Sequence, residues 1–273
     1  MDESLLKTML ESARKGGEVL MKYHLASDDL HVRTKGKFDY VTEADVAAQR
    51  AIVAVIQEHY PEHDILAEEA AATTRRSAIR WIVDPLDGTT NFIHGFPVFA
   101  VTVAIESEGT VLAGVVYDPT REELFLAEKD RGATLNGKPL AVSATREASE
   151  MLIATSFPWR KKLLLERYLA AFKCMFARVN DFRRTGSAAL DLAYVAAGRC
   201  DGFWELGLKP WDIAAGHLLV HEAGGKISDF SGGDRHIWVG DVVAGNTAAH
   251  DFLLPVIKGV FGGNVSQPLK ASP

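Results

Sequence analysis

The sequence predicts a layered fold of the α+β class in which the first sheet is largely antiparallel. Helical and strand-like patterns follow one another in mixed order along the chain, which favours layers of helices packed on sheets. Residues Val98–Glu106 and Thr110–Tyr117 alternate and are rich in β-branched side chains, and the E-S-E-G-T segment between them predicts an antiparallel hairpin. The length of 273 residues allows one large domain or two closely packed halves.

The first half begins with two helices. Apolar and small residues recur near helical spacing over residues 3–25, which predicts an amphipathic helix. The T-E-A-D segment that starts at Thr42 has the pattern of a capping box, so a second helix is expected from there to the residue before Pro61. The other expected segments are an extended piece at Leu30–Thr34, strands at His63–Leu66 and Arg80–Val83, and a mobile loop at 71–78.

The meander continues into a second half with a different pattern. A further strand is expected at Glu123–Ala127, and the Asn-Gly pair in L-N-G-K predicts a tight turn after it. Later strands are expected at Met151–Thr155, Gly202–Leu206, Lys226–Asp229 and Val242–Ala244, and helices at 160–176, Ser187–Ala197, Trp211–Ala223 and His250–Val260. We expect a single domain over 1–262 with two packed halves that meet near 145–150, followed by a disordered tail at 263–273.

Composition excludes several classes of protein. A hydrophobic content of 47% and a charged content of 24% are ordinary for a soluble globular protein. The net charge of −6 argues against a general nucleic-acid binder, so no direct nucleic-acid binding is expected. Two cysteines form no disulfide framework and fit a reducing cytosol. The charged N-terminus lacks the apolar core of a signal peptide, and no apolar run is long enough to span a bilayer. We therefore expect a cytoplasmic protein with no membrane association.

The run W-I-V-D-P-L-D-G-T-T-N carries the most chemical information. It places Asp84 and Asp87 three residues apart at the end of an apolar strand. Two carboxylates this close repel each other unless a cation lies between them, and hard oxygen ligands suit Mg²⁺. Backbone N–H groups at Gly88 and Thr89 would suit a phosphate group. The run therefore predicts a metal-assisted site for a phosphorylated substrate.

Other carboxylates could complete an acidic pocket. They are Asp45, Glu68, Glu69 and Asp212. Each also has a purely structural interpretation. Asp45 fits the partner of a Thr42 cap, a role that can coexist with a place in the site. Asp212 fits a charge that favours a helix N-terminus, Asp84-Pro85 fits a simple turn, and the Glu68-Glu69 pair fits a solvated surface. Their coincidence is much less probable than any one of these alternatives, and a converging set would require bound divalent metal.

The motifs resemble those of the inositol monophosphatase family, in its bacterial branch. W-I-V-D-P-L-D-G-T-T-N-F is similar to the family's first signature, and W-D-I-A-A-G-H-L-L-V-H-E-A-G-G is similar to its second, far downstream. K-G-K-F-D-Y-V-T-E-A-D and R-R-T-G-S-A-A-L-D-L-A-Y-V-A-A-G also fit, so the resemblance covers residues 3 to 260. It implies an αβαβα sandwich of the sugar-phosphatase type. One departure is A-E-E-A at 67–70, where the family often has Gly-Glu-Glu followed by Ser or Thr.

The resemblance also implies roles for individual residues. Glu68, Asp84 and the backbone carbonyl of Leu86 would hold a first Mg²⁺, and Asp84, Asp87 and Asp212 a second. Glu68 and, through water, Asp45 would help to hold a weaker third ion, and Mn²⁺ is an expected substitute. Thr89 would orient the attacking water. The expected catalytic residues are Glu68, Thr89 and Asp45. The expected substrate-binding residues are Asp87, Gly88, Thr89, Arg183, Gly186, Ser187, Ala188, Glu205 and Asp212.

The implied activity is hydrolysis of a small polyol phosphate monoester, with inositol 1-phosphate first among the candidates. The expected reaction is direct in-line attack by metal-bound water, with no covalent enzyme intermediate. Alternatives keep the chemistry and change the substrate to fructose 1,6-bisphosphate, 3′-phosphoadenosine 5′-phosphate, histidinol phosphate or NADP. A different alternative is a mainly protein-binding role with the transcription machinery. The resemblance also implies lithium sensitivity and a homodimer, for which the apolar meander around 98–117 is a candidate interface.

Overall fold

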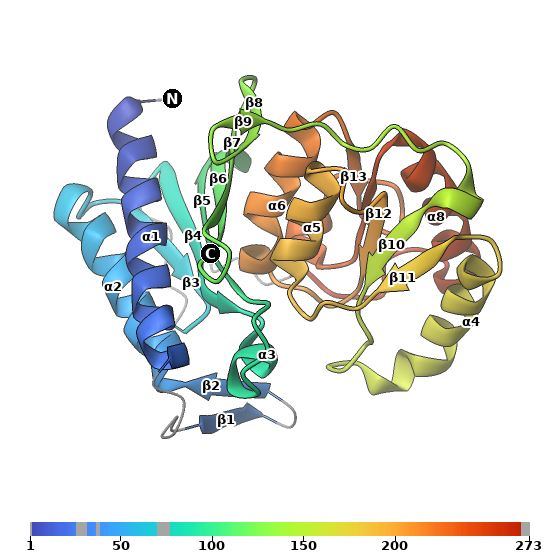
Figure 1. Cartoon of the computed structure of the whole chain (residues 1–273), viewed down its shortest axis with the longest axis horizontal. Helices are drawn as coiled ribbons and strands as arrows, with labels where there is room; N and C mark the ends of the chain where they lie inside the picture. Colours follow the sequence, from blue (N-terminus) through green and yellow to red (C-terminus); the bar gives the residue numbers. More distant parts are fainter. Residues whose placement is uncertain (1, 26–31, 37–38, 70–76, 269–273) are drawn as a thin grey trace.

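Two β-sheets alternate with three layers of helices in the computed structural model, which describes residues 2–25, 32–36, 39–69 and 77–268. The layers follow one another across the molecule in Figure 1, from α1 and α2 through the first sheet, the central helices α5 and α6 and the second sheet to α8 and α4. The predicted α+β class and αβαβα order are thus confirmed. Within the described ranges, no helix combines the length and apolar character needed to cross a bilayer.

Two long helices cover the outer face of the first sheet. They are α1 (Glu3–Leu25) and α2 (Glu43–His59), and α1 packs on strands β5 and β6. The capping box predicted at the start of α2 is present, because the Thr42 hydroxyl accepts from the backbone of Asp45 and the Asp45 side chain accepts from the backbone of Thr42. Before α2, β1 (Val32–Gly36) and β2 (Asp39–Thr42) form a separate antiparallel ladder.

The first sheet has seven strands in the order of the chain. They are β3 (Asp64–Ala67), β4 (Ile79–Asp87), β5 (Ala100–Ser107), β6 (Thr110–Asp118), β7 (Glu123–Glu128), β8 (Gly132–Leu135) and β9 (Lys138–Pro139). Only the β3–β4 pair is parallel, which confirms the expected antiparallel character. In the predicted L-N-G-K turn, Asn136 and Gly137 both have positive φ (49° and 79°), as a tight hairpin requires.

The meander at 98–117 is not available as an interface, so that expectation is wrong. Strand β5 is buried along nearly its whole length. Helix α1 packs on one of its faces and helix α6 (Pro210–Glu222) packs on the other. Continuous apolar runs are typical of strands covered on both faces, and they do not by themselves indicate a surface for a partner.

The central layer brings helices against both sheets. Helix α6 lies on the first sheet beside α5 (Ala188–Ala196). Its approach is closest at Gly114 of β6, where an added Cβ would lie 2.6 Å from the Ala215 Cα. Because that neighbour is backbone, only glycine permits this spacing. The spacing matters for the site, since the first turn of α6 carries Asp212.

The second sheet is mixed and has five strands in the order β11-β10-β12-β14-β13. They are β10 (Leu152–Thr155), β11 (Asp181–Arg183), β12 (Gly202–Glu205), β13 (Lys226–Ser228) and β14 (Val242–Gly245). Strand β10 runs parallel to β11 and to β12, while β14 is antiparallel to β12 and to β13. Helices α4 (Leu165–Phe176) and α8 (Thr247–Phe261) cover the outer face. The parallel strands deliver their carboxyl ends to one edge of the sheet.

Several short elements differ from the sequence-based expectations. They are α3 (Thr89–Ile93), α7 (His236–Val239), and the 3₁₀ turns η1 (Ala148–Glu150) and η2 (Lys162–Leu164). The helix expected from residue 160 begins only at Leu165, because Ser156–Lys161 form a loop after β10. Most of the expected loop at 71–78 lies outside the described residues. Of the expected disordered tail, residues 263–268 are described. Val265 in this segment packs against the hydrophobic core that lies between the second sheet and helices α4 and α8.

Candidate active site

A bulge in β4 places Asp84 and Asp87 on the same side of the first sheet. In a regular strand, residues three apart point to opposite faces. Here Asp84 pairs with Thr102 and Asp87 pairs with Ala100, so three steps along β4 match two along β5. The extra residue, at the Pro85-Leu86 step, rotates Asp87 back toward Asp84. The Asp84 Oδ1 accepts the Leu86 N–H at 2.9 Å and fixes this turn.

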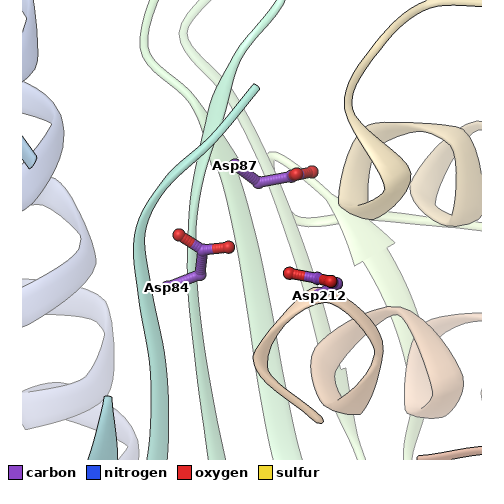
Figure 2. A group of neighbouring side chains, drawn as sticks. All are labelled: Asp84, Asp87 and Asp212. Atoms are coloured by element: carbon purple, nitrogen blue, oxygen red, sulfur yellow. The ribbon is translucent and has the colours of Figure 1, made fainter. Parts of the chain in front are cut away.

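Asp212 reaches the same place from the central layer. It lies in the first turn of α6, after Pro210, and its Oδ2 accepts the Lys209 N–H at 2.8 Å. The Thr102 hydroxyl donates to the Trp211 carbonyl at 2.8 Å, which ties this end of α6 to β5. Figure 2 shows the three carboxylates facing a common space between β4 and α6. One oxygen from each of Asp84, Asp87 and Asp212 lies within 4.8 Å of the others.

The three carboxyls are poorly solvated and repel one another. Burial raises the pKa of Asp84 well above its ordinary value, and Glu68, Asp87 and Asp212 raise it further. Burial raises the pKa of Asp212 to about 7, with added repulsion from Asp87 and Glu68. Burial also raises the pKa of Asp87 to about 6, against the hydrogen bonds from Ser187 and Ala189. A divalent cation would relieve this repulsion, and a set of hard carboxylate oxygens fits Mg²⁺ or Mn²⁺.

These shifts predict how the stability of the metal-free protein depends on pH. Carboxyls whose pKa rises on folding keep protons that the unfolded chain has lost. The free energy of unfolding should therefore fall as the pH rises from about 4 through about 7. With saturating Mg²⁺ this fall should become shallower, because the cation keeps the carboxylates ionised in the folded protein, as they are in the unfolded chain. Thermal melts with a chelator and with Mg²⁺ across this range measure both slopes; identical slopes would contradict the assignment.

The turn after Asp87 requires glycine and leads directly into helix α3. Gly88 has φ 97°, and an added Cβ would lie 2.9 Å from the Val98 carbonyl oxygen, so both conformation and space require glycine. Thr89 then opens helix α3. Its hydroxyl lies 3.3 Å from Asp45 Oδ1 and 3.2 Å from the Leu86 carbonyl oxygen. The Thr89 hydroxyl is therefore held against two acceptors at the floor of the site.

Asp45 combines the two interpretations that the sequence left open. Its Oδ2 accepts the Thr42 N–H at 2.8 Å and the Thr42 hydroxyl at 2.5 Å, which is the cap of α2. Its Oδ1 is the atom that faces Thr89. The side chain is fully buried, so the carboxylate connects the helix cap to the site without access to bulk water.

Helix α5 fixes Asp87 from the opposite side. The Ser187 hydroxyl donates to Asp87 Oδ2 at 2.6 Å, and the Ala189 N–H donates to the same oxygen at 2.8 Å. In helix α3, the Asn91 side-chain amide donates to the carbonyl oxygens of Val98 and Thr185 at 2.7 and 2.9 Å, which ties α3 to the segment before α5. Segments distant in the sequence are thereby locked around one carboxylate.

The site opens into a cavity of about 320 Å³. Most predicted site residues line it, namely Glu68, Asp84, Leu86, Asp87, Gly88, Thr89, Gly186, Ser187, Ala188, Glu205 and Asp212. Glu68 follows β3, and its N–H donates to the Val83 carbonyl at 3.2 Å. The neighbouring Glu69 is not among the lining residues, and its N–H donates to the Gln49 side chain at 2.9 Å.

Arg184 lines the cavity, whereas Arg183 does not. Strand alternation explains the difference, since adjacent side chains at the end of β11 point to opposite sides. The exposed Arg183 guanidinium instead pairs with Asp181 at 2.5 Å. We therefore place Arg184, rather than Arg183, at the mouth of the site.

The cavity is also lined by residues that the sequence did not indicate: Tyr40, Thr90, Ser156, Trp159, Arg160, Lys162, Arg184, Asp191 and Leu208. Many of them follow the parallel strands β10 and β11, whose carboxyl ends meet at one edge with that of β12. The segments that follow these strands could have been predicted to line the site, because ligands bind at the carboxyl edge of open α/β sheets. The S-F-P-W-R-K-K run after β10 combines an aromatic ring with cations at that edge.

Two further buried carboxyls face the cavity from its second half. Burial raises the pKa of Glu205 well above its ordinary value, and Asp191 and Asp212 raise it further. Burial likewise raises the pKa of Asp191, against a hydrogen bond from the Thr185 hydroxyl at 2.8 Å. Arg184 opposes both shifts. This wall therefore carries two buried carboxyl groups that can form hydrogen bonds with a bound molecule.

Many known proteins are similar to this chain in sequence or in fold. A model of the inositol monophosphatase family matches residues 1–259. The chain is 47% identical over 243 residues to the Nus factor SuhB of Salmonella typhimurium (strain LT2), which covers 89% of this chain and 91% of that protein. The suhB extragenic suppressor protein of Bartonella henselae superposes with a TM-score of 0.91, at 42% identity over 94% of this chain and 99% of that one. The inositol monophosphatase of Anabaena (Nostoc) sp. PCC 7120 gives 0.84, at 36% identity over 99% of each chain. The chain belongs to the inositol monophosphatase family and has the family's phosphatase fold.

Proposed function

We propose that this chain hydrolyses a small polyol phosphate monoester in a Mg²⁺-dependent reaction, with inositol 1-phosphate as the substrate. The observation that carries the proposal is the convergence of Asp84, Asp87 and Asp212 within 4.8 Å at the floor of a cavity. Such a set is unfavourable without divalent cations, and phosphate monoesters are hydrolysed extremely slowly without them. The cations would relieve the repulsion among these carboxylates and would also supply the catalysis that phosphate ester hydrolysis requires.

The roles follow from position. Glu68, Asp84 and the Leu86 carbonyl would hold one ion and Asp84, Asp87 and Asp212 another, with Glu68 and Asp45 supporting a third. Bound there, the ions would neutralise phosphate oxygens and acidify a water molecule. Thr89, whose hydroxyl already contacts Asp45, would orient the attacking water. Gly88 and Thr89 would offer N–H groups to the phosphate. We propose direct in-line displacement with no covalent intermediate.

The alcohol half of the cavity favours a neutral, hydroxyl-rich group. Glu205 and Asp191 are both buried there, beside Gly186, Ser187 and Ala188. A second phosphate placed against these carboxyls would be repelled, whereas ring hydroxyls could donate to them or accept from their neutral forms. This argues for inositol 1-phosphate over fructose 1,6-bisphosphate, 3′-phosphoadenosine 5′-phosphate and NADP. Histidinol phosphate, which carries an amine, is the strongest competitor.

A panel of phosphate esters tests the substrate. We expect Mg²⁺-dependent phosphate release, the highest kcat/KM on inositol 1-phosphate, activity with Mn²⁺, none after chelation, and inhibition by lithium. Higher kcat/KM on a nucleotide or on histidinol phosphate would overturn the inositol assignment but keep the chemistry. Absence of release from every ester at saturating Mg²⁺ would overturn the chemistry.

A second candidate is a role as a protein partner of the transcription machinery. Its support is the similarity to proteins named Nus factor SuhB. A catalytically inactive Asp84→Asn chain separates the two roles in a strain that lacks this protein. Full restoration of growth by that variant would make protein binding the cellular function. Failure to restore growth, with the variant folded and abundant, would make catalysis the cellular function.

We also propose a cytoplasmic homodimer. The two cysteines fit a reducing compartment, since Cys200 is buried and Cys174 is exposed without a disulfide. Large apolar side chains are exposed on and beside α4, including Leu165, Leu169 and Phe176. We propose this surface as the dimer interface in place of the meander at 98–117, which is buried.

A further inference from the structure

A buried carboxylate joins the C-terminal segment to the rim of the cavity. Asp241 is fully buried at the start of β14, and its Oδ2 accepts the backbone N–H groups of Val265 and Ser266 at 2.6 and 2.8 Å. Its Oδ1 accepts the Ser266 hydroxyl and the Gly207 N–H, the latter at 3.3 Å. The carboxylate therefore has protein donors on both oxygens, which is what a buried charge requires.

The tail is also held at a second point, by Ser231. The N–H of Ser231 donates to the Asn264 side chain at 3.2 Å, and the N–H of Asn264 donates to the Ser231 hydroxyl at 3.2 Å. Residues 264–266 are thus fixed by reciprocal bonds on one side and by Asp241 on the other. The described part of the tail is an ordered strap across the second half of the molecule.

The same strap contacts the cation-bearing loop over the cavity. Lys161 Nζ donates to the Ser266 hydroxyl oxygen. The Lys161 stem packs over Gly207, where an added Cβ would lie 3.5 Å from Lys161 Cε. Lys161 lies between Arg160 and Lys162, which both line the cavity together with Trp159. Arg160 is close enough to Asp87 and Asp212 to lower the pKa of both carboxyls.

We propose that Ser266, through Asp241 and Lys161, positions the 156–162 loop so that Trp159, Arg160 and Lys162 face the bound phosphate ester. Ser266 is a positioning residue, because it touches neither metal ligands nor the cavity itself. The kinetic part of the inference rests on the proposed phosphatase function. The structural part, that the strap holds the loop, stands without it.

The full-length Ser266→Ala variant tests the inference, with Ser231→Ala as a matched control. Ser266→Ala keeps both backbone bonds to Asp241 but removes the hydroxyl that meets Lys161. Ser231→Ala removes one bond to the same strap and leaves the loop contact intact. A Lys161→Met variant removes the ammonium from the other side while keeping the apolar stem.

Trypsin supplies a readout that needs no activity, because the loop contains the R-K-K run at 160–162. We expect native cleavage there, mapped by mass spectrometry, to be roughly threefold faster or more in Ser266→Ala, and unchanged in Ser231→Ala. In active enzyme, KM should rise about tenfold with little change in kcat, as for loss of one hydrogen bond to a charged group. The increases in KM caused by Ser266→Ala and Lys161→Met should not add; this comparison uses KM because Lys161→Met also removes one trypsin site.

The outcomes separate cleanly. Equal cleavage rates in Ser266→Ala and the wild type would overturn the strap. Faster cleavage with an unchanged KM would overturn its positioning role. Additive effects of the two substitutions would overturn the Lys161 link. A wild type without activity, but with the predicted trypsin result, would count against the proposed function and not against the strap.

Discussion

Asp84→Asn is expected to abolish Mg²⁺-dependent phosphate release and, at the same time, to raise the melting temperature of the metal-free protein. The side-chain amide oxygen of the substituted residue can still accept the Leu86 N–H, so the bulge in β4 should persist. The substitution removes a buried negative charge that faces Asp87 and Asp212. Loss of a cation that stabilises several kcal/mol of transition-state charge corresponds to a rate decrease on the order of 10³-fold.

The paired result is what distinguishes a metal site from an acidic core element. In a structural role, losing the carboxylate would lower stability. In a metal site, repulsion among the three carboxylates destabilises the metal-free fold, so removing one of the charges stabilises it. Differential scanning calorimetry in chelator at about pH 8, above the pKa values of Asp87 and Asp212, measures the first effect and phosphate release the second. A less stable Asp84→Asn protein in chelator would contradict the account.

Gly114→Ala is expected to cause a large loss of stability through a single methyl group. The new Cβ would lie 2.6 Å from the Ala215 Cα, so α6 must move off the first sheet. Overpacking of this kind costs about 1–3 kcal/mol, or roughly 3–10 °C in melting temperature for a chain of this size. Because α6 carries Asp212, Mg²⁺ affinity should fall as well.

Gly259→Ala is the matched control, since it makes the same chemical change on helix α8. Nothing lies within 4 Å of a Cβ added there. An alanine inside a helix is favoured over glycine by about 0.5–1 kcal/mol, so this variant should be slightly more stable. Thermal melts of both variants, with Mg²⁺ titrations, check the prediction. A Gly114→Ala protein as stable as Gly259→Ala would show that α6 does not depend on this contact.

Local chemistry made much of the fold predictable. The Thr42 capping box, the Asn136-Gly137 turn and the alternating meander each depend on a few neighbouring residues, and each formed as expected. Asp84 and Asp87 were recognisable because two carboxylates so close in an apolar strand need a cation. Their common orientation depends on the bulge between them. Pro85 is compatible with a bulge, but the two-residue period of a regular strand would place the two side chains on opposite faces.

Long-range contacts set what the sequence did not reveal. Arg160 and Arg184 reach the cavity because they follow the carboxyl ends of β10 and β11, and Asp191 reaches it from helix α5. The polar residues after Gly262 have the composition of a free tail, yet Asp241 and Ser231 satisfy the backbone of residues 264–266. The meander reads as an apolar surface until the helices on both sides are placed. In each case the deciding partner lies far away in the chain.

Calorimetric titration of the metal-free protein with Mg²⁺, and then with Mn²⁺, tests the central claim most directly. The account predicts saturable binding of at least two ions, release of protons near neutral pH, and loss of binding in Asp84→Asn. Proton release follows because Asp87 and Asp212 have pKa values of about 6 and about 7 before the metal enters. No saturable uptake of either metal by a folded wild-type protein would contradict it.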